Sequence, residues 1–81
     1  MFKNKNDLSN NLCGENIKRI RQAKFPGLSQ RGLAEKLQLA GIDLDKNAIQ
    51  RIESGKRFVT DIELVAFSRI LEVSLEELIE I

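Results

Sequence analysis

The chain has 81 residues, of which 42% are apolar and 31% charged, and this composition is typical of one small soluble globular domain. It contains no histidine and a single cysteine, Cys13, which excludes a zinc site of the usual type and removes the commonest catalytic base. No apolar run approaches the ~20 residues needed to cross a bilayer, and no glycine-rich phosphate loop is present. We therefore expect a protein that is not an enzyme, holds no metal or cofactor and does not enter a membrane.

The net charge of +1 conceals an uneven distribution of charge along the chain. Residues 1–57 carry a net charge of +6, whereas residues 58–81 carry −5. A basic N-terminal part and an acidic C-terminal part favour a protein with one face that binds a polyanion, although charge can also fall unevenly in any small protein. Because Cys13 has no partner for an internal disulfide and the N-terminus lacks the apolar stretch of a secretory signal, we expect a cytoplasmic protein.

The N-terminal part of the chain divides into an arm and a first helix. Residues 1–10 are polar and rich in asparagine, so we expect a flexible arm ahead of one domain over residues 11–81. From Leu12 the apolar spacing becomes helical. This helix should end near Lys24, because Pro26 disfavours the helical conformation of the residue before it.

Two capped helices are predicted in the middle of the chain. Ser29 is a good N-cap for a helix that ends near Gln38, and Asp45 is a good N-cap for the next one. Gly55 is placed to end that third helix in the left-handed conformation. Residues 39–44 connect the two helices through a turn.

The last third of the chain contains two capping boxes, in which a hydroxyl side chain is followed three residues later by glutamate. Thr60 with Glu63 opens a fourth helix, and Ser74 with Glu77 opens a short fifth one. No run alternates as a strand would. The fold class predicted from the residues is therefore all-α, with five short helices joined by tight turns.

The exposed side of the predicted third helix carries cationic and amide side chains and no acidic one: Lys46, Asn47, Gln50 and Arg51. Arginine and lysine donate well to guanine, and asparagine and glutamine pair with adenine, in the major groove of DNA. The alternative is that these are ordinary solvated positions. The residue types alone do not decide between the two.

A family resemblance adds to this interpretation. Residues 28–37 followed by residues 48–57 strongly resemble the helix-turn-helix of the phage lambda repressor/Cro family, often called the XRE-type regulators. Residues 17–21 and 71–78 are similar to the flanking helices of that family, so the resemblance covers about residues 12–80. It implies a compact five-helix lambda repressor-like DNA-binding domain, with the helix-turn-helix formed by its second and third helices.

The resemblance also implies roles for individual residues. The start of the second helix should meet a phosphate, the third helix should face the major groove, and the residues just after it should grip the DNA backbone. Arg21 and Glu53 match positions that pair in this family and lock the first helix to the third. The residues expected at DNA are Gln30, Lys46, Asn47, Gln50, Arg51, Lys56 and Arg57.

The chain departs from the family pattern in two places. The connection from Gln38 to Asp45 is longer than the short turn usual in the family. Alignment with the family backwards from Ile49 places Asp45 at its cap position and Leu44 at its buried apolar position. Phe25 and Pro26 also form an insertion after the first helix. Neither change touches the residues expected at DNA, but the longer connection could shift the third helix or add contacts.

The function predicted is a sequence-specific regulator of transcription, most often a repressor in such a family, that binds double-stranded DNA. We expect a homodimer through the C-terminal helix, with Ile79 and Ile81 first in the contact. The alternative is a monomer in which Leu75 and Leu78 cap the core and Ile81 frays. The alternative function is a helix-turn-helix module for protein–protein interaction, or an antitoxin-like adaptor, with weak DNA binding.

Overall fold

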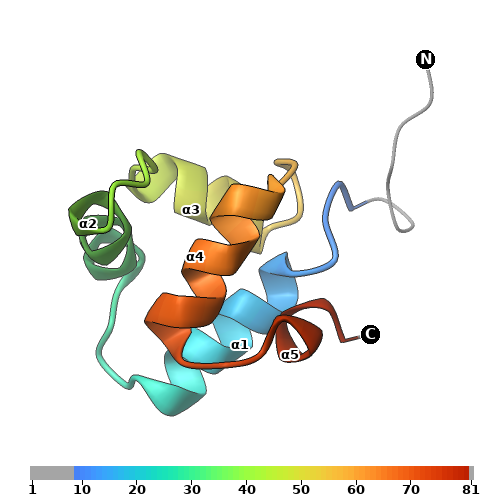
Figure 1. Cartoon of the computed structure of the whole chain (residues 1–81), viewed down its shortest axis with the longest axis horizontal. Helices are drawn as coiled ribbons and strands as arrows, with labels where there is room; N and C mark the ends of the chain where they lie inside the picture. The colour runs from blue at the N-terminus through green and yellow to red at the C-terminus, as the bar shows by residue number, and fades with distance from the viewer. Residues whose placement is uncertain (1–8, 81) are drawn as a thin grey trace.

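The structure, a computed structural model, describes residues 9–80, which form five α-helices (Figure 1). The helices are α1 (Gly14–Lys24), α2 (Gln30–Leu39), α3 (Lys46–Glu53), α4 (Asp61–Leu71) and α5 (Leu75–Ile79). The all-α class and the order of five short helices are thus confirmed. Among the described residues, no helix has the length and apolar character required to cross a membrane.

All four predicted N-caps are confirmed by a side-chain oxygen that accepts a backbone N–H three residues on. Ser29 and Asp45 start α2 and α3 in this way, with distances of 3.0 Å and 2.8 Å. Thr60 and Ser74 start α4 and α5, each within a complete capping box. These caps satisfy N–H groups that have no partner inside the helix. They therefore fix where each helix begins.

The start of α1 depends on a contact between distant parts of the chain. Cys13 occupies the N-cap position without a side-chain bond, and Asn11 Oδ1 accepts the Gly14 N–H instead, at 2.7 Å. A Cβ atom at Gly14 would collide with the backbone oxygen of Ile52 at the end of α3. Glycine thus lets the first turn of α1 approach the end of α3 closely.

All five helices contribute to the core, whose largest fully buried side chains are Ile17, Leu33, Leu37, Ile49, Ile52, Phe67, Leu71 and Leu78. Burial of one such side chain is worth about 1.5–3 kcal/mol relative to exposure. In Figure 1, α3 lies at the top of the molecule and α1 and α5 lie below α4. The core therefore holds α3 by one face and leaves its other face at the surface.

The long connection between α2 and α3 is hydrogen-bonded to the end of α2. Gly41 has φ +87°, which reverses the chain at the end of α2, and the Ile42 N–H donates to the Leu37 carbonyl at 2.9 Å. Leu44 is buried, as predicted, and its carbonyl accepts a hydrogen bond from Gln38 Nε2 at 3.0 Å. Leu44 and the half-buried Ile42 therefore pack against the domain, while the other residues of the connection are exposed.

Candidate nucleic-acid interface

The outer face of α3 is a row of exposed polar side chains. Ile49 and Ile52 are fully buried on the inner face of this helix. Its exposed side carries the four residues predicted to read DNA, which are Lys46, Asn47, Gln50 and Arg51. Within the described part of the chain, none of these four side chains forms a hydrogen bond. Their donors and acceptors are therefore available to an external partner.

A buried ion pair connects α1 to α3. Arg21 Nε and Nη2 donate to the two carboxylate oxygens of Glu53 at 2.8 Å and 3.0 Å, and Arg21 Nη1 donates to the Leu28 carbonyl at 2.8 Å. Both side chains are less than a tenth exposed. Such a two-pronged pair fixes direction as well as distance. The pairing of Arg21 and Glu53 that the resemblance implied is confirmed.

Gln30, the residue expected at a phosphate, lies at the start of α2 and is held by the same carboxylate. Its Nε2 donates to Glu53 Oε1 at 2.9 Å. A glutamine amide has two N–H groups. One N–H of Gln30 is therefore bound inside the protein and the second can still meet an acceptor outside. The bond to Glu53 was not predicted from the sequence.

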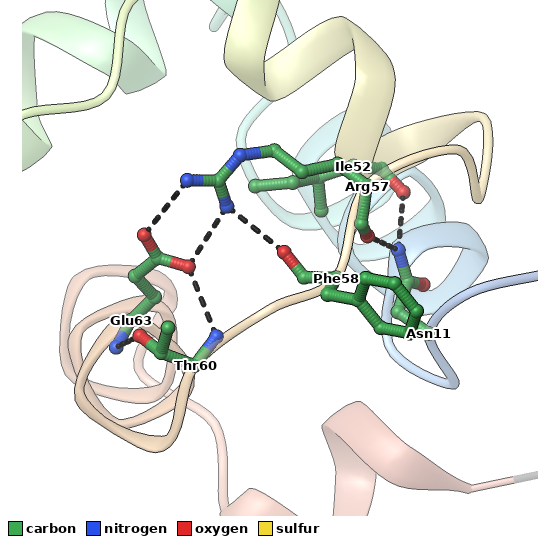
Figure 2. A network of polar contacts seen from close by, with 6 residues as sticks. All are labelled: Asn11, Ile52, Arg57, Phe58, Thr60 and Glu63. Carbon is green, nitrogen blue, oxygen red and sulfur yellow. Dashed lines mark hydrogen bonds and ion pairs between the residues drawn. The ribbon is translucent and has the colours of Figure 1, made fainter. Parts of the chain in front are cut away.

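The connection after α3 carries Lys56 and Arg57, the two residues expected to grip the DNA backbone. Lys56 is exposed, and its backbone oxygen accepts a hydrogen bond from Asn10 Nδ2 at 3.0 Å. The Asn11 amide donates to the backbone oxygens of Ile52 and Arg57 at 3.1 Å and 2.8 Å (Figure 2). The end of the predicted arm is thus bound to this connection, while residues 1–8 lie outside the described part.

Arg57 is more enclosed than Lys56, because Glu63 at the start of α4 holds its guanidinium (Figure 2). Nη1 and Nη2 of Arg57 donate to the two oxygens of Glu63 at 2.9 Å and 3.1 Å, and Nη1 also donates to the Phe58 carbonyl at 3.0 Å. These bonds lower the pKa of the Glu63 carboxyl below its usual value and raise the pKa of Arg57. The pair is charged at neutral pH.

Sequence reasoning placed Glu63 only in a capping box and did not single out Asn11. The capping role of Glu63 is confirmed, since its Oε1 also accepts the Thr60 N–H at 3.0 Å. The pairing with Arg57 joins two residues across the start of a helix, where no helical spacing signals a contact. Asn11 acts on residues more than 40 positions away, which a local pattern cannot indicate.

The chemistry of this surface suits binding rather than catalysis. Its exposed groups are ammonium, guanidinium and amide groups, which can bind phosphates and base edges. Burial raises the pKa of the Cys13 thiol to about 11, so this sulfur stays protonated at neutral pH. Within residues 9–80 no cluster of potential ligand side chains could hold a metal ion.

A comparison with protein families supports the interpretation of this surface as a nucleic-acid interface. The sequence profile of a helix-turn-helix family matches residues 17–78, which include all five helices except the start of α1 and the last residue of α5. No curated protein and no solved structure matched the chain.

Proposed function

This chain belongs to the Cro-type (XRE) helix-turn-helix family, a non-catalytic family of DNA-binding domains, and we propose that it is a sequence-specific regulator of transcription that acts in the cytoplasm. We propose repression as the mode of action, because occupation of DNA alone suffices for it. The observation that carries the proposal is the exposed face of α3, whose polar side chains have no partner among the described residues.

In this proposal α3 enters the major groove and reads base edges. Lys46 and Arg51 would donate to guanine O6 and N7, and Asn47 and Gln50 would pair with adenine. Glu53 would keep α3 in the orientation needed to contact the bases, because its bonds to Arg21 tie α3 to α1 and restrict rotation of α3.

The residues around α3 would set the position of the protein on the DNA backbone. Gln30 would offer its second N–H to a phosphate at the positive end of α2. Lys56 would provide a free ammonium group, and Arg57 would contribute the N–H groups that Glu63 and the Phe58 carbonyl leave unbound. Such contacts carry affinity and orientation without sequence information.

We further propose a homodimer through α5. Leu78 is fully buried in the core, whereas Leu75 and Ile79 are 43% and 42% exposed on this short helix. Two apolar side chains at one surface offer a contact to the same helix of a second subunit, while Ile81 lies outside the described residues. The basic surface around α3 remains free in this arrangement.

A protein–protein module is the second candidate, and one observation favours it. Leu39 and Ile62 are 89% and 69% exposed. Ile62 borders a shallow apolar hollow that α4 forms with Ala40 and Ile42. In a module of this kind the partner would sit at the hollow, and DNA binding would be weak.

The salt dependence of binding to duplex DNA separates these two functions. Each phosphate contact by a cation adds about −0.9 to the slope of log affinity against log salt. We expect Lys56→Ala to weaken binding to all duplexes alike and to flatten the slope by about that amount. Lys18→Ala is the matched control, since Lys18 is an exposed cation on α1 that is not among the residues expected at DNA, and its loss should leave the slope unchanged. Absence of binding even at low salt would favour the protein–protein module.

A further inference from the structure

We propose that Glu63 is a specificity-determining residue, which withholds the charge of Arg57 from DNA and thereby weakens binding to duplexes of any sequence. This inference rests on the proposed function, because it concerns the strength with which the same surface grips phosphates. It assigns to Glu63 a role beyond the start of α4.

The first support is the number of Arg57 donors already in use. An arginine has five N–H groups. Two of them donate to Glu63 and a third donates to the Phe58 carbonyl (Figure 2). The guanidinium therefore has only Nε–H and one Nη2–H left, and its charge is compensated by a carboxylate at hydrogen-bond distance.

The second support is that neither partner can move away easily. The Glu63 carboxylate is fixed by the Thr60 N–H independently of Arg57, and its side chain is 13% exposed. The backbone of Arg57 is fixed from the other side, where the Asn11 amide binds its carbonyl at 2.8 Å. To form a full ionic contact with a phosphate, Arg57 would have to leave a carboxylate that stays in place.

The third support is the contrast with the adjacent residue. Lys56 is exposed, and within the described residues no carboxylate pairs with it. The two neighbouring cations thus differ: Lys56 offers a whole charge to a phosphate, and Arg57 offers directed N–H groups with little net charge. Because non-specific binding depends on the number of phosphates neutralised, the ion pair lowers that binding and leaves the reading by α3 dominant.

The test compares salt slopes on a duplex of arbitrary sequence for wild type, E63Q, R57Q and the double variant, after circular dichroism shows that each is folded. E63Q keeps an amide oxygen for the Thr60 cap and frees the Arg57 charge. We expect it to bind more tightly, with a slope steeper by about 0.9. The double variant should keep the wild-type slope, because it removes both charges of the pair. R57Q alone should bind less tightly than wild type, because it leaves the Glu63 carboxylate without a compensating cation. E76Q is the matched control, because it removes one exposed carboxylate on α5 and should change the slope little.

Other slopes would overturn the proposal. If the slope of the double variant is shallower than that of wild type by about 0.9, Arg57 already neutralises a phosphate and Glu63 withholds nothing. A slope for E63Q equal to that of E76Q leads to the same conclusion. If wild type and Lys56→Ala bind no duplex at any salt concentration, the proposed function has failed, and the inference fails with it. The wild-type titration alone thus separates the two failures: the proposed function fails if no duplex is bound, and this inference alone fails if duplexes are bound but the slopes differ from those expected.

Discussion

Two glutamates hold the polar groups around the reading helix, and they do so in different environments. Glu53 is buried and binds Arg21 and Gln30, while Glu63 is near the surface and binds Arg57 and the Thr60 N–H. No buried side-chain nitrogen or oxygen of the described residues lacks a hydrogen-bond partner. Each carboxylate therefore orients side chains that we propose to contact DNA, and touches no DNA itself in that proposal.

The buried pair leads to a prediction on stability. Removal of one partner of a buried ion pair costs about 3–5 kcal/mol, because the other charge loses its compensation. We expect Arg21→Met to be strongly destabilising and Glu53→Gln to be milder, since glutamine keeps a hydrogen-bond acceptor. In a double-mutant cycle by urea denaturation, the coupling between the two positions should be about 0.5–3 kcal/mol.

Lys18→Met is the matched control for that cycle, since Lys18 is an exposed cation on the same helix. Its loss should change the free energy of unfolding by no more than about 0.5 kcal/mol. A coupling of zero between positions 21 and 53 would show that the pair does not lock α1 to α3.

At the residue scale, contacts between distant parts of the chain were predictable only where a family pattern existed. The resemblance predicted that Arg21 and Glu53 pair, and the structure confirms it. Nothing in the sequence predicted that Glu63 binds Arg57, because the two residues lie on either side of the start of α4, where no helical spacing signals a contact. The expected contacts of Gln30, Arg57 and the residues of α3 with DNA stay predictions.

At the scale of elements, the helices were predictable because their start signals are local. The hydroxyl and carboxylate caps of α2 to α5 lie within three residues of the N–H groups they satisfy, so sequence spacing is enough to find them. The end of α3 was also predictable, since Gly55 adopts φ +79°.

The start of α1 was less predictable than its end. The helix begins at Gly14, two residues after the periodic pattern starts at Leu12, because Asn11 supplies the cap and binds the carbonyls of Ile52 and Arg57. That geometry depends on how α1 packs against α3. Similarly, the path of the long connection depends on the burial of Leu44, which the family alignment indicated and the composition of the turn did not.

At the scale of the whole molecule, a single reading helix contacts only a few base pairs, which favours a two-fold dimer on DNA. Half-sites for such dimers lie about 34 Å apart, one turn of the double helix. We expect sedimentation with a palindromic duplex to show two subunits per duplex. Ile79→Lys should still bind each half-site, but it should abolish the gain in affinity that comes from joining two half-sites in one duplex. Glu76→Lys is the control on the same helix. One subunit per half-site, with no such gain in wild type, would rule out the dimer.

The central claim is that the exposed face of α3 reads DNA sequence. The most direct measurement selects duplexes bound by the purified protein and compares affinities for the preferred duplex and a shuffled duplex of equal length, for wild type, Asn47→Ala and Arg51→Ala. We expect each variant to lose about 1–3 kcal/mol on the preferred duplex, about 5-fold to 150-fold in affinity, with a smaller loss on the shuffled one and an unchanged circular dichroism spectrum. Equal losses on both duplexes, or a selection that yields no preferred sequence, would contradict the claim.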